Sequence, residues 1–351
     1  MKKKVMIAMS GGVDSSAAAL LLRRQGYDCA GAMMKLYDGE TAEGGCCSAA
    51  DAEDARGAAY RLGMDFYMFN ETERFARDVM DRFVAEYRAG RTPNPCIDCN
   101  RCLKFGAFLD RALTLGYDYI ATGHYARVSF EDGRYHLLRG RDRGKDQSYV
   151  LYQLTQEQLS HIRFPLGGLC KKEVRALAAE YGFINAEKKD SQDICFVPDG
   201  DHARFIEDYL QQKALPGPFV DTEGHVLGTH RGIIRYTIGQ RKGLGIASDA
   251  PYYVSEIRPQ TNEVVLGRKE SVMKDRLTAE DVCWLSIERP KESLRAKAKI
   301  RYRYPDAPCT VTMTGEDRME VVFDEKQSAP AAGQAVVLYD GDRVLGGGTI
   351  L

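Results

Sequence analysis

The sequence lacks the long apolar runs that mark membrane proteins. No run in its 351 residues approaches the length of a membrane span, and the first apolar run, Val5–Met9, is shorter than the core of a secretory signal. The composition is 44% hydrophobic and 28% charged, with a single tryptophan. This balance is typical of a globular protein, so we expect a cytoplasmic protein of two or three domains that makes no membrane contact.

The chain also lacks a large net charge of either sign. The formal net charge is −1, yet residues 230–304 contain 16 Lys and Arg against 9 Asp and Glu. A second basic stretch covers residues 134–145. Clustered positive charge attracts phosphate, so the two stretches together predict a surface that binds nucleic acid.

Cysteine, by contrast, is plentiful, with ten residues. In a cytoplasmic enzyme of this size, cysteines favour metal binding or sulfur chemistry over a disulfide framework. Four of them lie in apolar or strand-like surroundings, where a free cysteine packs as a small hydrophobic residue: Cys29, Cys170, Cys283 and Cys309. We therefore identify the cysteines that have a chemical role from their neighbours in the sequence.

The stretch with the clearest chemistry is Lys4–Arg24. The apolar run Val5–Met9, the turn Ser10–Gly12 and a following Ala- and Leu-rich segment predict a buried parallel strand, a tight turn and a helix. Asp14 or Ser15 is expected to cap that helix. Glycines let backbone N–H groups approach a ligand, and a helix N-terminus favours anions, so the turn is suited to phosphate. It is not a Walker loop, because the required lysine is missing.

The string Ser10–Ser15 resembles the pyrophosphate loop of the ATP pyrophosphatases. These enzymes cleave ATP between the α and β phosphates and adenylate an oxygen atom. The resemblance implies that the loop amides, with Ser10 and Ser15, hold pyrophosphate and that Asp14 lies near Mg²⁺.

Alternating strands and helices predict the fold of the first 200 residues. We expect strands over 28–34, 65–69 and 117–122 and helices over 49–62, 72–87, 100–115 and 171–181. This α/β alternation indicates a doubly wound parallel sheet that binds ligands beyond the carboxyl ends of its strands. Gly123 lies at such an end, where a nucleotide could meet bare backbone. His124 could meet a phosphate or a base, or be satisfied within the fold.

The pattern changes after about residue 200. A helix from 202 to 212 and a Pro- and Gly-rich linker precede short strands, among them a hairpin of 252–257 with 263–267. Several short strands then continue to the C-terminus, which suggests a small β-barrel. We therefore expect three domains: a catalytic, nucleotide-binding domain over 1–200, a small central domain over 201–272 that binds nucleic acid, and a C-terminal β-barrel over 273–351.

Two cysteines carry the reactive chemistry we expect. Prolines at 93 and 95 break one helix before the next, which is expected to begin near residue 100, so Cys99 falls at or just before a helix N-terminus. The dipole there favours a thiolate. Cys195 lies between Ile194 and Phe196, and its neighbours alone indicate a buried core thiol.

Over essentially its whole length the sequence resembles the bacterial tRNA-specific 2-thiouridylases. The resemblance rests on AMSGGVDSS at 8–16, RTPNPCIDCN at 91–100, ATGHYAR at 121–127, KDQSYVL at 145–151, KKDSQDICF at 188–196, YTIGQRKGLG at 236–245 and RYRY at 301–304. It implies a tRNA-uridine 2-sulfurtransferase that adenylates the C2 oxygen of the wobble uridine and replaces it by sulfur. The implied partners are tRNA and a protein that donates sulfur as a persulfide.

The resemblance also implies roles for individual residues. Cys195 receives the persulfide, and Cys99 is the partner nucleophile, so turnover leaves a Cys99–Cys195 disulfide that a reductant opens. The implied ATP contacts are Ala8, Met9, Ser10, Gly11, Gly12, Val13, Asp14, Ser15, Met33 and Gly123. The segment that touches the target base is Asn94, Pro95 and Cys96. The implied tRNA contacts are His124, Lys145, Asp146, Gln147, Arg301, Tyr302, Arg303 and Gln334.

Alternatives remain open at this point. Cys96, Cys99 and Cys195 could instead hold a [4Fe–4S] cluster whose fourth iron binds sulfide, and Cys102 extends the Cys-x-x-Cys spacing. A more distant alternative is a small-molecule ligase or amidase that uses the same loop but needs no paired cysteines. A third alternative is a non-enzymatic protein that binds RNA or stores metal, but in such a protein the pyrophosphate loop would have no role. We expect a monomer.

Overall fold

The computed structural model of the chain describes residues 2–37, 48–188 and 194–351. The chain divides into two compact units. Unit 1 comprises Met1–Val79, Cys96–Gly200 and Gly341–Leu345, and unit 2 comprises Met80–Pro95, Asp201–Asp340 and Gly346–Leu351. Within the described residues, no helix has both the length and the apolar character needed to cross a membrane.

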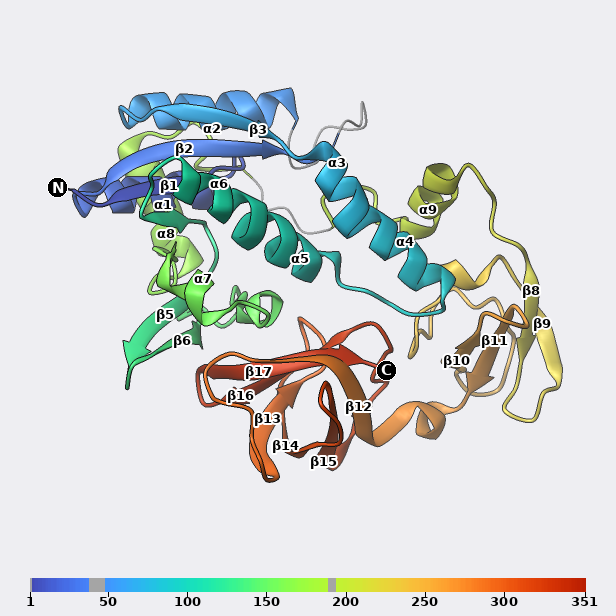
Figure 1. Cartoon of the computed structure of the whole chain (residues 1–351). Helices are drawn as coiled ribbons and strands as arrows, with labels where there is room; N and C mark the ends of the chain where they lie inside the picture. The colour runs from blue at the N-terminus through green and yellow to red at the C-terminus, as the bar shows by residue number, and fades with distance from the viewer. Residues whose placement is uncertain (1, 38–47, 189–193) are drawn as a thin grey trace. The chain divides into compact units, whose positions relative to one another are not determined.

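Unit 1 is built on a five-stranded parallel sheet with strand order β3-β2-β1-β4-β7 (Figure 1). Its strands are β1 (Lys4–Ala8), β2 (Asp28–Lys35), β3 (Phe66–Asn70), β4 (Tyr119–Ala121) and β7 (Ile162–Arg163). Val5 in β1 pairs with Cys29 in β2 on one side and with Tyr119 in β4 on the other. In chain order, β2 and β3 are added on one side of β1, and β4 and β7 on its other side. The carboxyl ends of β1 and β4 therefore border the topological switch point. Ligands bind at such a point in open parallel sheets.

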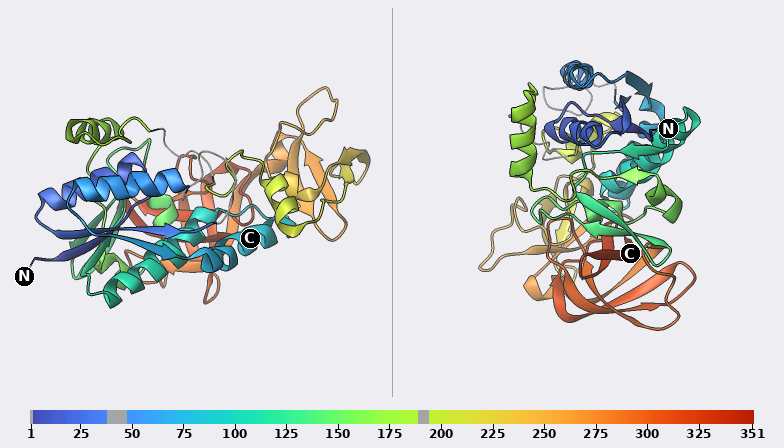
Figure 2. Two further views of the ribbon diagram at one scale, coloured as in Figure 1. Left: turned by 90° about the horizontal axis from the view of Figure 1, so that it is seen from above. Right: turned by 90° about the vertical axis from the view of Figure 1, so that its left-hand side faces the viewer.

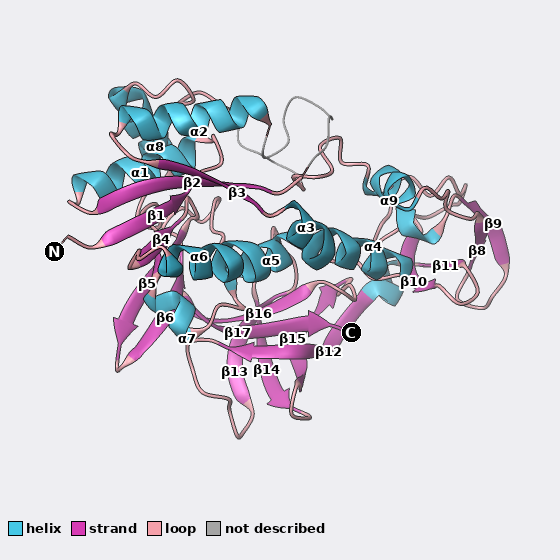
Figure 3. Cartoon of the chain, turned by 45° about the horizontal axis from the view of Figure 1, so that its top comes forward, coloured by secondary structure: helices cyan, strands magenta, loops and turns pink. Residues whose placement is uncertain are grey.

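Helices cover both faces of this sheet (Figure 3). The helical segments of unit 1 include α1 (Val13–Arg24), α2 (Ala49–Arg61), α3 (Thr72–Phe75), α5 (Pro95–Asp98), η2 (Cys99–Ala107), α6 (Phe108–Thr114), η3 (Ser148–Leu151), α7 (Gln156–Ser160) and α8 (Lys171–Tyr181). On one face, the buried side chains of α1, α2 and α8 form a core with β1 and β2; Ile7, Leu20 and Ala178 belong to it. The Ala-rich sequences of α1 and α2 permit this close packing, because small side chains let a helix approach the sheet.

The predicted helix over 72–87 is present, but part of it has π-helical geometry. It comprises α3, the π-helix η1 (Ala76–Met80) and α4 (Asp81–Arg88). A longer π-helical stretch, η2, begins at Cys99. π-Helical turns are rare and are often found at functional sites.

The expected start of the helix near residue 100 is wrong. Helical structure begins at Pro95 and runs through α5, η2 and α6 to Thr114. Proline is favoured in the first turn of a helix because its missing N–H has no partner there and its φ angle is already helical. Cys99 therefore lies one turn inside the helical run, and Cys96 lies in the first turn.

Unit 2 contains a four-stranded sheet of strand order β10-β11-β8-β9. Its strands are β8 (Gly217–Val220), β9 (Val226–His230), β10 (Tyr253–Arg258) and β11 (Glu263–Gly267), and the helical segments beside it are α9 (His202–Leu210) and η4 (Ile233–Arg235). The predicted hairpin is confirmed, since Tyr253 pairs antiparallel with Gly267. The β8–β9 hairpin, in the stretch after the linker, was not predicted.

The last strands form a closed β-barrel (Figure 2). The barrel strands are β12 (Met273–Trp284), β13 (Leu294–Lys299), β14 (Ala307–Met313), β15 (Arg318–Ser328), β16 (Ala335–Asp340) and β17 (Arg343–Ile350), and the short helix η5 (Lys269–Val272) precedes them. Pairing of β12 with β17, for example Ala279 with Ile350, closes the ring. The hairpin of β5 (Ala126–Glu131) and β6 (Arg134–Arg139) adds to this sheet where Arg343 pairs with Leu138. The predicted fold class, a parallel α/β sheet followed by a small central domain and a C-terminal β-barrel, is confirmed.

Candidate functional site

The loop after β1 has the geometry of an anion-binding turn. Gly11 has φ +72°, and a Cβ atom there would lie 2.3 Å from the backbone oxygen of Asp51 in α2. Gly12 is extended and precedes the first residue of α1. The first N–H groups of a helix have no partner within the helix, so this turn presents backbone donors and the positive end of α1 to a phosphate.

The prediction that Asp14 or Ser15 caps α1 is wrong. The N-cap is Gly12, and no side chain caps the helix. Ser15, which is buried, instead donates its hydroxyl to the carbonyl of Gly12 (3.1 Å) and accepts from the N–H of Ser10 (3.3 Å). The Ser15 side chain therefore braces the turn from within.

Asp14 lies in the first turn of α1 and pairs with Lys171, the first residue of α8. The Lys171 ammonium lies 2.8 Å from each carboxylate oxygen of Asp14, and the Tyr125 hydroxyl donates to one of them at 2.8 Å. Only 11% of the Lys171 side chain is exposed. A buried cation thus lies beside the glycine turn.

Sequence reasoning missed both Lys171 and Tyr125. A lysine in the first turn of a helix faces the positive end of the helix dipole, which is unfavourable unless another charge compensates. A lysine at the predicted start of α8 was therefore the one feature of the sequence that indicated an acidic partner. The partner itself, 157 residues away, could not be identified from local pattern.

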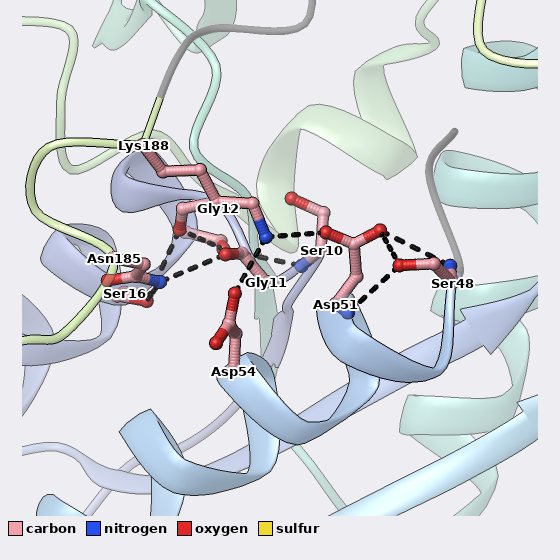
Figure 4. A network of polar contacts seen from close by, with 10 residues as sticks. Ser10, Gly11, Gly12, Ser16, Ser48, Asp51, Asp54, Asn185 and Lys188 are labelled. Carbon is pink, nitrogen blue, oxygen red and sulfur yellow. Dashed lines mark hydrogen bonds and ion pairs between the residues drawn. The ribbon is translucent and has the colours of Figure 1, made fainter. Parts of the chain in front are cut away.

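A second polar network holds the turn from the other side (Figure 4). Asn185 donates its amide to the carbonyl of Gly11 and to the hydroxyl of Ser16, both at 3.0 Å. The Lys188 ammonium lies 2.7 Å from Asp51 and 2.6 Å from Asp54 in α2. Burial lowers the pKa of Lys188, but the two carboxylates outweigh it and raise the pKa overall. Residues 189–193 of the KKDSQDICF motif lie outside the described residues.

The other residues implied as ATP contacts lie around the same turn. Gly123 follows β4, and a Cβ atom there would lie 3.0 Å from the backbone N of Ser15, so Gly123 lies directly against the first turn of α1. Met9, Val13 and Met33 are buried in the core beneath the turn. The side chains of these three residues therefore support the site from below, while Ser10 is exposed and Ala8 half-buried.

His124 is a buried internal residue. Its Nδ1 lies 2.6 Å from the hydroxyl of Thr122, and its ring packs between Phe105 and Phe164. Burial lowers the pKa of His124 well below its ordinary value, so the ring is neutral at pH 7. The alternative of a histidine satisfied within the fold agrees with this placement better than a phosphate contact does.

Asp146, one of the implied tRNA contacts, is buried. The Asp146 carboxylate is buried and accepts from the N–H groups of Gly140 and Ser148 and from the Ser148 hydroxyl. Gln147 pairs with both backbone groups of Tyr125. Burying a charged residue is favourable only when hydrogen bonds satisfy it, which is the case here. Lys145 is half-buried.

The cysteines of the site differ in exposure. Cys96 is exposed, Cys99 is buried, and Cys102 and Cys195 are half-buried. Phe196, next to Cys195, packs edge-on against Phe75 of α3, with 5.6 Å between ring centroids. α3 also contacts η2 (Cys99–Ala107), so the segments that carry Cys195 and Cys99 both border α3.

Two cysteines outside the site are expected to be chemically inert. Burial raises the pKa of the Cys29 thiol to about 11 and that of the Cys309 thiol to about 12. Both thiols are therefore protonated at about pH 8, and only a thiolate reacts readily. We expect iodoacetamide at this pH to leave both unmodified in the folded protein, as measured by mass spectrometry, and to alkylate the exposed Cys96. Equal labelling of Cys29 and Cys96 before denaturation would contradict this prediction.

The remaining predicted residues lie in unit 2. Arg301, Tyr302 and Arg303 form a turn after β13. Asn94 is half-buried and Pro95 is buried. Gln334 lies just before β16, and its amide donates to the backbone carbonyl of Thr92 at 2.8 Å.

Family models and curated relatives match the chain along its length. The model described as tRNA methyl transferase HUP domain matches residues 3–199, the tRNA methyl transferase PRC-barrel domain matches 203–268, and the aminomethyltransferase beta-barrel domain matches 274–350. A protein of Carboxydothermus hydrogenoformans described as tRNA-specific 2-thiouridylase MnmA is 51% identical over 99% of this chain and 98% of its own length. A protein of Lachnoclostridium phytofermentans with the same description is 50% identical over 99% of both chains.

Proposed function

The chain belongs to the family of tRNA-specific 2-thiouridylases, and on this premise we propose that it replaces the 2-oxygen of the wobble uridine of tRNA by sulfur in an ATP-dependent reaction. The identity of about half the residues along the whole chain carries this proposal. The glycine turn at the switch point of the parallel sheet supports it, because the reaction needs a site that accepts pyrophosphate.

The first step activates a poor leaving group. The uridine O2 attacks the α-phosphorus of ATP, the bond from that phosphorus to the β-phosphate oxygen breaks, and pyrophosphate leaves. In this proposal the backbone donors of Gly11 and Gly12 and the N-terminus of α1 hold the departing pyrophosphate. Lys171, held by Asp14, adds positive charge beside the turn.

The second step delivers sulfur. The terminal sulfur of a Cys195 persulfide attacks C2, the C2–O bond breaks, and AMP leaves with the former uridine oxygen. The Cys99 thiolate then attacks Sγ of Cys195, which releases the thiocarbonyl and forms a Cys99–Cys195 disulfide. Alternatively, Cys99 attacks the persulfide first and releases hydrosulfide, which attacks C2. In both routes two electrons from an external dithiol reductant restore the thiols.

The residues implied as metal or cluster ligands do not form a metal site among the described residues. Within residues 2–37, 48–188 and 194–351, ligand atoms of three His, Cys, Asp or Glu residues lie within 4.8 Å of one another only in the group Asp221, Glu223 and His225. Cys96, Cys99 and Cys195 form no such group in this part of the chain. Asp14, expected near Mg²⁺, is neutralised by Lys171. We therefore derive no step through magnesium or an iron–sulfur cluster.

We assign tRNA contacts to the basic side chains that reach solvent. Lys145 and the Arg301–Arg303 turn lie in the two basic stretches of the sequence, and an arginine pairs well with phosphate. A protein carrying a persulfide is the proposed sulfur donor. We propose that the enzyme acts as a cytoplasmic monomer.

The proposal is tested by incubating a tRNA transcript that has a wobble uridine with the protein, ATP, a persulfide donor and a dithiol. We expect 2-thiouridine in the nucleoside digest by mass spectrometry, with AMP and pyrophosphate formed in proportion. A transcript with cytidine at the wobble position is the control. Pyrophosphate release that needs no tRNA would favour the small-molecule ligase instead. Iron and sulfide analysis of anaerobically purified protein distinguishes the cluster route, since the persulfide route needs neither.

A further inference from the structure

Two residues of unit 2 hold Thr92, which lies just before Asn94 in the chain, by hydrogen bonds to its backbone N–H and its backbone carbonyl. The N–H of Thr92 donates to the carbonyl of Ala332 at 2.7 Å, and the amide of Gln334 donates to the carbonyl of Thr92 at 2.8 Å. Ala332 and Gln334 belong to the turn that leads into barrel strand β16. A loop far away in the sequence thus fixes the backbone of Thr92, two residues before Asn94.

A side chain of the small central sheet region holds Thr92 as well. The Thr92 hydroxyl lies 3.3 Å from the hydroxyl of Thr237. Thr237 also hydrogen-bonds Tyr87 of α4, whose pKa burial raises to about 12, so this tyrosine stays protonated at neutral pH. The two threonines and Tyr87 form a chain of hydroxyl contacts between α4, Thr92 and the loop after η4.

The packing around Thr92 leaves little freedom. Gly333 has φ +85°, and a Cβ atom there would lie 2.9 Å from the backbone N of Thr92 and 3.0 Å from Cβ of Arg91. Arg91 is itself held by two hydrogen bonds to Glu86. After Thr92, prolines at 93 and 95 fix their own φ angles and restrict the residues before them, so the position of Thr92 determines the position of Asn94.

The loop that holds Thr92 is anchored in turn. Arg301 donates to the carbonyls of Ile238 and Ala329, at 3.3 Å and 2.5 Å. A Cβ atom on Gly239 would lie 2.5 Å from Cβ of Ala329, so the loop after η4 lies directly against the chain that precedes Gln334. Three segments of unit 2 therefore meet at Thr92 and support one another.

From this arrangement we propose that Gln334 and Thr92 are positioning residues, which set Asn94 and Pro95 in the place where the target uridine is bound. This inference rests on the proposed function and gives Gln334 a role different from the tRNA contact that the family resemblance implies. The amide hydrogen of Gln334 is committed to the Thr92 carbonyl, and the side chain is half-buried. The barrel then contributes to the rate of reaction through the geometry of residues 92–95.

The test is the variant Gln334→Met, which keeps the length of the side chain and removes the donor. Loss of one hydrogen bond that orients the site is expected to lower kcat for 2-thiouridine formation by about tenfold. The Kd for tRNA, measured by filter binding, should stay within about twofold of the unchanged enzyme, since a positioning residue makes no RNA contact. Gly333→Ala should act in the same direction, because its Cβ presses on Thr92.

The matched control is Gln327→Met. Gln327 lies in the same barrel, but its amide donates to Glu325 within its own strand, so neither kcat nor Kd should change. A rise in the tRNA Kd of Gln334→Met with unchanged kcat would establish a direct RNA contact and overturn the proposal, as would no change in either quantity.

A second readout needs no activity. Hydrogen exchange of the peptide over residues 91–98 should be faster in Gln334→Met than in the unchanged protein, and unaltered in Gln327→Met. Equal exchange in all three proteins would contradict the positioning role. If the unchanged enzyme forms no 2-thiouridine, the proposed function fails, while this exchange measurement still decides whether Gln334 orders the segment.

Discussion

Replacing Cys195 by serine is expected to lower the rate of 2-thiouridine formation by at least about a thousandfold, because a serine hydroxyl cannot accept sulfur as a persulfide. Cys195 lies outside the pyrophosphate-binding turn, so tRNA-dependent release of pyrophosphate in a single turnover should persist. The measurement pairs mass spectrometry of the nucleosides with a pyrophosphate assay on the same reaction. Loss of sulfur transfer with retention of adenylation separates the two steps.

The control for Cys195→Ser is Cys283→Ser in barrel strand β12. Cys283 is also half-buried, but the chemistry assigns it no role, so both activities should be retained. Cys102→Ser tests the alternative. If iron is present and Cys96→Ser abolishes both the iron content and sulfur transfer, the cluster route replaces the persulfide route. Undiminished thiolation by Cys195→Ser would contradict both routes.

Replacing Lys171 by methionine is expected to slow tRNA-dependent pyrophosphate release by about a hundredfold, because the change removes a preorganised positive charge beside the turn. It also leaves the Asp14 carboxylate without its cation. Breaking a buried ion pair costs up to about 3–5 kcal/mol of stability, and since 32% of the Asp14 side chain is exposed we expect the cost to be below that range. The Tyr125 hydroxyl continues to donate to Asp14.

The matched control for Lys171→Met is Lys172→Met. Lys172 is the next residue of α8 and is exposed, so its loss should change neither pyrophosphate release nor the melting temperature. Lys171→Arg keeps the charge and should recover part of the rate. A normal rate of pyrophosphate release in Lys171→Met would show that the ion pair serves the fold alone.

The regular elements could be predicted from the sequence because their signals are local. The apolar run Val5–Met9 predicted β1 to within one residue of each end, and the Ala-rich segment after it predicted α1, whose N-cap lies two or three residues before the expected one. The amphipathic pattern over 171–181 predicted α8. The alternation of strands and helices then restricts the sheet to a parallel, doubly wound arrangement.

The start of the helical run before Cys99 could not be predicted, because a proline can either break a helix or open one. Pro95 opens this helical run, and the position of Cys99 relative to the helix dipole changes with it. The burial of Asp146 does not follow from its neighbours in the sequence either, since a charge in a polar stretch usually faces solvent. Three local hydrogen bonds make its burial favourable here.

The partners of the site residues were beyond prediction for a different reason. Lys171 meets Asp14, and Gln334 meets Thr92, across 157 and 242 residues of chain. Such contacts follow from how whole elements pack and leave no local periodicity. The motifs located the reacting groups, while the residues that orient those groups emerged only in three dimensions.

The central claim is that the 2-oxygen of the target uridine leaves with AMP. The most direct test uses a tRNA transcript whose wobble uridine carries oxygen-18 at C2, incubated with the enzyme, ATP, a persulfide donor and a dithiol. Mass spectrometry of the released AMP should find one oxygen-18 atom for each 2-thiouridine formed. Formation of 2-thiouridine with unlabelled AMP would contradict adenylation of that oxygen and with it the role assigned here to the glycine turn.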